Sequence, residues 1–425
     1  MTSDNRTRFQ LFFRALSSRN YLLFFIGQGI SLIGTWLQFT AIGWLVYRLT
    51  NSAFLLGTVG FAGQFPSFLL ASFAGVIADS FNRRKILMIT QIMYMIQSFI
   101  LAMFVLTGIV TIWHVVILSL ITGCIGAFDM TTRQSFVVDI VDKKEHLGNA
   151  IALNSILFNS ARLIGPSIAG LLIAYFGEGM CFLLDSISFL PIIIALVLIK
   201  SNQKRMETRE TRILQGIKEG LTYILGSVSI KTTLFLTGLV SLMGMSYGVL
   251  MPVFAKDIFH GGPRTLGYLI SASGLGAIVG AASMASKKSP GGLEKTIPSG
   301  SAIFGMGLIG FSFASNLYFA FLLLFLAGLG MMVFFTSANT LLQSTVEVGK
   351  IGRVMSYYTM AFMGTMPFGS LLSGILANKI GVQNTVFMGG VFCIAGALIF
   401  VHIVKPRHPA AYHDGIDTGN FKIVN

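Results

Sequence analysis

The sequence predicts an all-α membrane protein in which twelve transmembrane helices form two repeated halves of six helices. Hydrophobic residues make up 54% of the chain and charged residues 11%, and the mean hydropathy is +0.77. Soluble domains carry about 25% charged residues, so this composition argues against a water-soluble enzyme. Twelve long apolar runs predict the transmembrane helices, and short motifs that recur between the halves predict the repeat.

Each apolar run has about 20 residues, the length with which a helix crosses the hydrocarbon core of a bilayer. In chain order the runs cover residues 20–47, 53–78, 86–107, 112–136, 149–176, 180–199, 230–254, 266–286, 296–314, 317–343, 353–378 and 384–404.

We expect these runs to divide the chain into a cytoplasmic N-terminus over 1–19, six-helix bundles over 20–199 and 230–404, a cytoplasmic linker over 200–229 and a cytoplasmic tail over 405–425. The second half of the linker places apolar residues at helical spacing beside charges. That pattern is typical of a helix that lies at the membrane interface.

The distribution of basic residues predicts the orientation of the chain. With the N-terminus inside, 25 of the 30 Lys and Arg residues fall in cytoplasmic segments and Arg48, Lys256, Arg264 and Lys379 fall outside. This bias is the one that membrane insertion imposes on short loops, so we expect both termini in the cytoplasm. Because the formal charge of +14 is spread over these loops, it does not indicate nucleic-acid binding.

An internal repeat relates the two halves. Leu56-Gly57 in the second run recurs as Leu266-Gly267 in the eighth, at an offset of 210 residues. Many transporters consist of two repeated six-helix halves, which move against one another and hold one substrate site between them. Further matches are Ser31-Leu32-Ile33-Gly34 with Ser241-Leu242-Met243-Gly244 at the same offset, and Gly148, Gly165, Gly170 and Gly177 with Gly352, Gly369, Gly374 and Gly381 at an offset of 204.

The loop after the second run carries a charged motif, Gly-Val-Ile-Ala-Asp-Ser-Phe-Asn-Arg-Arg-Lys, over residues 75–85. Gly75 permits close helix approach, Asp79 and Arg83 can form a charged latch at the membrane surface, and Arg84 helps to hold the loop inside. In this position of a twelve-span chain, the motif resembles the signature loop of the major facilitator superfamily.

The resemblance implies a role for the latch. In that family the aspartate and arginine engage the end of helix 4 and the start of helix 11, which stabilises the outward-open state. Carried over, Asp79 and Arg83 would engage Asp129 or Arg133 and residues 352–356. This sequence has Ser80 and Asn82 where the family prefers Arg and Gly, so we expect a weaker latch.

A second motif lies in the fifth run, where residues 161–170 include Gly165, Pro166 and Gly170. It resembles the antiporter motif of the same superfamily, which is commoner in exporters than in importers, although Gly and Pro also occur in ordinary membrane helices. Residues 127–134 and 352–369 resemble the branch that contains macrolide-efflux and enterobactin-export proteins. The resemblance implies a multi-pass protein of the bacterial cytoplasmic, or inner, membrane.

A few polar side chains inside the runs mark a candidate substrate cavity. Arg162 lies deep in the fifth run, where an ionisable group is by default a functional hypothesis. Lipid would leave such side chains unsatisfied, so we expect them to line a common polar space. The candidates are Arg162, Asn159 and Ser155 in the fifth run, Gln28, Thr35 and Gln38 in the first, and Asn339 and Gln343 in the tenth.

Two acidic residues inside the runs are candidates for the proton carrier. Arg162 stays protonated, so it can hold an anionic substrate group or pair with a titrating carboxylate, but it cannot carry the proton. Asp129 is the best candidate carboxylate, with the alternative that Arg133, one turn later, pairs with it structurally. Asp185 is the other candidate, with a structural role favoured there, and the first run contains no acid.

We expect a secondary active transporter that exports a bulky amphipathic small molecule, a drug or macrolide or a siderophore, by proton antiport and alternating access. The sequence shows no P-loop, metal-ligand cluster or nucleophile constellation, so we expect no enzyme activity, no cofactor and no metal site, with the proton gradient as the energy source. The expected partners are the substrate and membrane lipids, and the expected state is a monomer. Two alternatives stay open: a lysophospholipid flippase, and a membrane sensor or assembly protein that moves nothing.

Overall fold

The computed structural model describes residues 14–141, 144–199, 213–286, 291–347 and 350–404, and every regular element within these ranges is a helix. The first group of long helices comprises α2 (Arg19–Thr50), α3 (Ala53–Ser80), α4 (Arg83–Leu106), α5 (Ile112–Ile140), α6 (Leu147–Phe176) and α7 (Glu178–Leu198). Short 3₁₀ turns, η1 (Arg14–Ser17) and η2 (Lys144–His146), precede α2 and α6.

The second group is more broken. It comprises α8 (Ile213–Gly226), α9 (Val228–Leu239), η3 (Val240–Gly244), α10 (Tyr247–Val253), η4 (Phe254–Ile258), α11 (Pro263–Ala285), α12 (Leu293–Ser312), α13 (Leu317–Thr345), α14 (Ile351–Met363), α15 (Met366–Ile380) and α16 (Val382–Ile403). The elements from α9 to η4 follow one another as a single span, in which η3 and η4 are π-helical turns. Likewise α14 and α15 form one span that is interrupted at Gly364.

Eleven spans in the described part of the chain are long and apolar enough to cross a membrane. The predicted run at 296–314 corresponds to α12, which is not among the eleven. This helix begins with Leu293, Glu294 and Lys295 and contains several serines and glycines, which lower its hydropathy. It nevertheless packs between α13 and α16, in the place of a twelfth span.

Single glycines make the tightest turns between spans. Gly177 joins α6 to α7 and Gly381 joins α15 to α16, with φ angles of 80° and 87°. Positive φ is readily adopted only by glycine, so these positions explain why glycine recurs there at the offset of 204 residues. Asn51, which also tolerates the left-handed region, ends α2 with φ of 48°.

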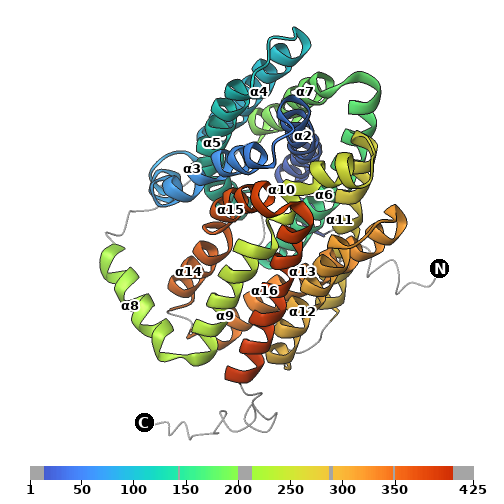
Figure 1. Ribbon diagram of the computed structural model, residues 1–425. Coiled ribbons are helices and arrows are strands. Elements are labelled where there is room, and N and C mark those ends of the chain that lie inside the picture. The colour runs from blue at the N-terminus through green and yellow to red at the C-terminus, as the bar shows by residue number, and fades with distance from the viewer. Residues whose placement is uncertain (1–13, 142–143, 200–212, 287–290, 348–349, 405–425) are drawn as a thin grey trace, which may run out of the picture.

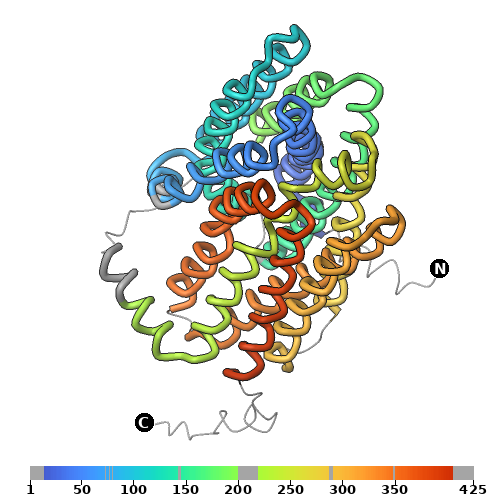
Figure 2. Tube along the Cα trace, viewed as in Figure 1, coloured from blue at the N-terminus to red at the C-terminus, as the bar shows by residue number. Residues whose placement is uncertain are grey.

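The helices gather into two groups, one for each half of the sequence. Figure 1 shows α2, α3, α4, α5 and α7 in the upper part of the view, and α9, α12, α13, α14 and α16 in the lower part. The coloured trace in Figure 2 follows the chain through the first group before it enters the second. The groups meet mainly where α6 packs on α11 and α3 packs on α15, with smaller contacts of α10 on α2 and α3.

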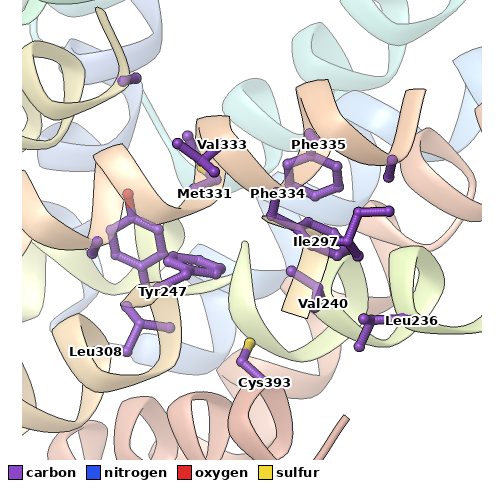
Figure 3. Packing of buried hydrophobic residues seen from close by; sticks show 14 of the residues in the cluster. Leu236, Val240, Tyr247, Ile297, Leu308, Met331, Val333, Phe334, Phe335 and Cys393 are labelled. Carbon is purple, nitrogen blue, oxygen red and sulfur yellow. The ribbon is translucent and has the colours of Figure 1, made fainter. Parts of the chain in front are cut away.

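The largest apolar core lies in the second group. Figure 3 shows part of it, with Leu308 below Tyr247, Phe334 close to Phe335, and Cys393 on a separate helix below them. Inside a bilayer the lipid is as apolar as these side chains, so close packing rather than dehydration holds such a core together. Two smaller clusters of buried residues lie in the first group.

We call the two ends of the helix bundle the hairpin end and the linker end, after the connections that each carries. The hairpin end carries the short connections at residues 51–52, 107–111, 177, 259–262, 313–316 and 381. The linker end carries, among the described residues, those at 81–82, 141 and 144–146, 199 and 213–227, 286 and 291–292, and 346–347 and 350, together with residues 14 and 404.

The groups approach one another most closely in the halves of the helices near the hairpin end. A Cβ on Gly57 of α3 would lie 2.9 Å from Cα of Gly374 in α15, and a Cβ on Gly267 of α11 would lie 3.1 Å from Cα of Gly170 in α6. Only glycine permits such backbone contact between helices. Gly57 and Gly267 are related by the 210-residue offset, and Gly170 and Gly374 by the 204-residue offset, so the two seams are copies of one another.

Candidate substrate site and its gates

Arg162 lies between the two groups. It is half-buried near the middle of α6, its Nη2 atom is 3.9 Å from Sδ of Met331 in α13, and its guanidinium carbon is 5.8 Å from the ring centre of Trp36 in α2. No acidic side chain in the described part of the chain pairs with it. The sequence placed this residue in a substrate site, and the structure places it between helices of both groups.

Two further aromatic side chains pack against Trp36, the indole beside the Arg162 guanidinium. The ring centre of Trp36 lies 5.4 Å from that of Phe39 and 6.0 Å from that of Phe158, both in edge-to-face arrangements. Phe39 and Phe158 are each 48% exposed. We call Arg162, Trp36, Phe39, Phe158 and Met331 the Arg162 cluster.

The other polar candidates of α6 and α13 extend toward the linker end. Asn159 is half-buried and Ser155 is exposed, and both lie within two turns of Arg162 on α6. In α13, Asn339 is half-buried and accepts a hydrogen bond from the exposed side chain of Gln343. Arg162 therefore has polar positions on its linker-end side in both groups.

The structure separates the three polar candidates of α2. Thr35 is exposed, and its hydroxyl donates to the carbonyl of Ser31. Gln38 is wrong as a cavity residue, because it is buried inside the first group and its Nε2 donates to Oε1 of Gln97 in α4 over 3.0 Å. Gln28 is also buried, at 3% exposure, and its Oε1 has no partner among the described residues.

Asp129 has a full set of hydrogen-bond donors. Arg133, one turn later in α5, donates from Nε over 3.0 Å and from Nη2 over 2.5 Å. Thr90 and Gln91 of α4 donate to the other carboxylate oxygen over 3.0 and 2.6 Å. This arrangement joins α4 to α5 and corresponds to the structural alternative that the sequence left open.

Asp185 differs from Asp129 in its surroundings. The residue is 0% exposed in α7, and neither carboxylate oxygen has a hydrogen-bond partner among the described residues. Gly34 of α2 faces it, since a Cβ on that glycine would lie 2.8 Å from Oδ1 of Asp185. A buried carboxyl without a partner is costly when ionised.

The charged loop at the linker end forms a different latch from the expected one. The two Nη1 contacts of Arg83 with the carboxylate of Asp139, near the end of α5, are both 3.0 Å. The expected partners Asp129 and Arg133 bind one another instead, because they lie two to three turns deeper along α5. The side chain of Asp79 lies outside the described residues.

Neighbouring loop residues hold the first group together. The guanidinium of Arg84 donates to the carbonyl of Leu196, and to that of Val197 over 2.7 Å, at the end of α7. It therefore satisfies carbonyls that a helix end leaves free. A Cβ on Gly75 would meet no atom within 4 Å, so the close approach expected there is absent in this arrangement.

The glycines of the fifth-run motif pack against both groups. A Cβ on Gly165 would lie 2.4 Å from Cβ of Trp36, so this glycine lets α6 approach α2 beside the Arg162 cluster. Gly170 and the carbonyl of Pro166 face Gly267 of α11, on the other side of α6. The motif thus brings three helices together near Arg162.

A set of polar contacts joins the groups at the hairpin end. The hydroxyl of Tyr47 donates to the carboxylate of Asp257 in η4, and Nζ of Lys256 donates to Oδ1 of Asn51 over 2.6 Å. Nζ of Lys256 also lies 5.4 Å from the ring centre of Tyr47. We call Tyr47, Asn51, Lys256 and Asp257 the hairpin-end gate.

Comparison with known proteins identifies the family. Residues 13–417 match the sequence model of the transmembrane secretion effector family. The chain belongs to this family of major facilitator transporters.

Relatives of this secretion-effector chain are exporters and siderophore transporters. It is 24% identical to the staphyloferrin A transporter of Staphylococcus aureus, over 89% of this chain and 95% of the relative. It is 23% identical to macrolide efflux protein A of Streptococcus pyogenes, over 88% and 93%, and 24% identical to the multidrug efflux pump Tap of Mycolicibacterium fortuitum, over 84% and 88%.

Solved structures show the same fold. A D-xylose-proton symporter superposes with a TM-score of 0.71 at 14% identity, covering 90% of this chain and 98% of the symporter. A bacterial homologue of the human lysosomal transporter Spinster, in an inward-facing conformation, superposes with a TM-score of 0.68 at 13% identity, over 91% and 96%. The secretion-effector chain therefore has the major facilitator fold.

Sequence reasoning about this transmembrane secretion effector missed two features. The aromatic members of the Arg162 cluster lie on the same helices as the predicted polar residues, and Trp36 and Phe39 flank Thr35 closely enough to have been noticed. The hairpin-end gate was missed although Lys256 was counted among the few basic residues at that end.

Proposed function

We propose that this protein is a secondary active exporter that moves a bulky amphipathic small molecule, chemically unchanged, across the bacterial cytoplasmic membrane. The single observation that carries the proposal is the position of Arg162, which contacts both groups at the level where their close contacts end. A site between two repeated halves that rock is the arrangement required for alternating access.

We propose that the linker end lies in the cytoplasm. The distribution of Lys and Arg over the loops supports this orientation, because short cytoplasmic loops carry the excess of basic residues. In that orientation the glycine seams and the hairpin-end gate close the outer side of the transporter. The exposed side chains of Ser155 and Gln343 then lie on the side from which a cytoplasmic substrate would enter.

Proton antiport is the proposed source of energy, and Asp185 is the better proton carrier of the two candidates. The carboxylate of Asp129 is already held by Arg133 and two further donors, in a contact that joins α4 to α5. Asp185 has no such partner and faces Gly34 of α2, the helix that also contributes Trp36 to the Arg162 cluster. A change in the protonation of Asp185 would therefore act on α2, the helix that would contact the substrate.

The relatives support drugs, macrolides and siderophores as the cargo to test first. Inverted membrane vesicles containing the protein would be given an imposed pH gradient and a panel of one hydroxycarboxylate siderophore and several macrolides. We expect uptake of at least one compound, lost when a protonophore collapses the gradient. Equal uptake into vesicles that lack the protein, for every compound, would contradict the proposal.

A further inference from the structure

We infer that the exported molecule is an anion, with a carboxylate or phosphate-type group that binds Arg162 and an apolar part that binds the neighbouring aromatic side chains. This inference rests on the proposed export function and names the charge class of its substrate. It separates anionic amphipaths from the cationic ones that many drug exporters accept.

The first argument is the charge balance around Arg162. Three other arginines of the first group pair with acids: Arg48 with Glu178 over 2.6 Å, Arg83 with Asp139, and Arg133 with Asp129. Arg84 binds the backbone carbonyls at the end of α7. Arg162 instead contacts a thioether and an indole face, neither of which carries a compensating charge. Its counter-ion must therefore come from outside the described protein.

The second argument concerns a cationic substrate. A cation bound beside Arg162 would need an acidic side chain to offset the repulsion of the guanidinium. Of the acids inside the helices of the first group, Asp129 is occupied by Arg133 and Asp185 is 0% exposed behind α2. The site thus discriminates against cations by repulsion as well as favouring anions by attraction.

The third argument is that the Arg162 cluster combines an anion-binding group with apolar rings. The guanidinium presents a planar fork of donors that suits carboxylate and phosphate oxygens. Trp36 lies beside it, Phe39 and Phe158 pack against Trp36, and these two phenylalanine rings are half exposed. An anionic head on an apolar or aromatic body matches both features.

The test compares two dyes of similar size, a fluorescein-type carboxylate and a rhodamine-type cationic ester, in inverted vesicles and by thermal shift on the purified protein. The variants are Arg162→Gln and Arg162→Lys. Lys379→Gln is the matched control, because it removes one positive charge from an exposed position at the hairpin end. An anionic lysophospholipid forms a third arm, to distinguish a lipid headgroup from a soluble anion.

We expect wild type and Lys379→Gln to take up the carboxylate dye at least tenfold faster than the cationic dye. Arg162→Gln should lose at least tenfold of the carboxylate uptake and its thermal shift, and Arg162→Lys should retain part of both. Binding of the carboxylate dye without transport would support the anion site while contradicting the export function. Arg162-dependent binding of the lysophospholipid alone would assign the anion to a lipid. Preference for the cationic dye, or unchanged carboxylate binding in Arg162→Gln, would overturn the inference.

Discussion

Gly267 of α11 lies against Gly170 of α6, so that a Cβ on Gly267 would come within 3.1 Å of the Cα of its partner. Gly57 and Gly374 repeat this contact between α3 and α15. Because both seams are made from repeated glycines, the two halves pack against each other in the same manner at α6 and α11 and at α3 and α15.

The first prediction concerns the seam itself. Gly267→Ala places a methyl group 2.5 Å from the carbonyl oxygen of Pro166, and such overpacking costs about 1–3 kcal/mol. We expect the population closed at the hairpin end to fall, seen as faster thiol labelling of a cysteine introduced nearby. Gly248→Ala is the control, since a Cβ there meets no atom within 4 Å. Equal labelling in the two variants would show that the seam does not govern closure.

The second prediction concerns the hairpin-end gate. Tyr47→Phe removes the phenol that donates to Asp257, a bond worth about 1 kcal/mol because Asp257 is exposed. We expect the equilibrium to shift about fivefold toward opening at that end, measured as a spin-label distance distribution across α2 and α11. Tyr318→Phe is the control, since that tyrosine is 81% exposed and its ring packs against Phe321 of the same helix. An unchanged distribution in Tyr47→Phe would count against the gate.

The third prediction concerns the linker-end latch. Asp139→Asn removes the charge that faces Arg83 at two 3.0 Å contacts. We expect the maximum transport rate to fall several-fold while the half-saturating substrate concentration stays within twofold, because the pair lies far from Arg162. Asp139→Glu should restore most of the rate. A change confined to substrate affinity would argue for a different role.

The fourth prediction compares the two buried carboxylates. Asp185→Asn should abolish proton-driven accumulation and leave substrate equilibration intact, with little loss of thermal stability, because that carboxyl has no partner to lose. Asp129→Asn should instead lower the thermal unfolding temperature, since Arg133 would remain partly buried without its counter-charge. Wild-type accumulation in Asp185→Asn would remove this residue as the proton carrier.

The positions of the spans followed from hydropathy alone, because nothing in lipid satisfies a backbone except a helix. The break in the span from α9 to η4 could not be predicted. There the amides of Met245 and Phe259 bond to carbonyls five residues earlier, Val240 and Phe254, and no local residue pattern requires this.

The candidate site was predictable only in part. A polar stripe on one helix says that those side chains need a polar neighbour, but not which neighbouring helix supplies it. Gln38 shares its helix with Thr35, yet it bonds to Gln97 within the first group while Thr35 is exposed. The partner of Arg83 was missed for a related reason, since Asp129 and Asp139 both lie on α5 and only the packing decides which one reaches the loop.

The unneutralised guanidinium of Arg162 also bears on how the membrane voltage acts on the cycle. With Asp185 as the proposed proton carrier, the returning carrier holds a protonated Asp185 and reorients with the single positive charge of Arg162. The carrier that holds a monoanion and an ionised Asp185 reorients with one net negative charge. A potential of 100 mV acts on a unit charge with about 2.3 kcal/mol. With the linker end in the cytoplasm, the negative interior would draw the positively charged, proton-loaded carrier back to face inward. It would also favour the outward step of the negatively charged, substrate-loaded carrier.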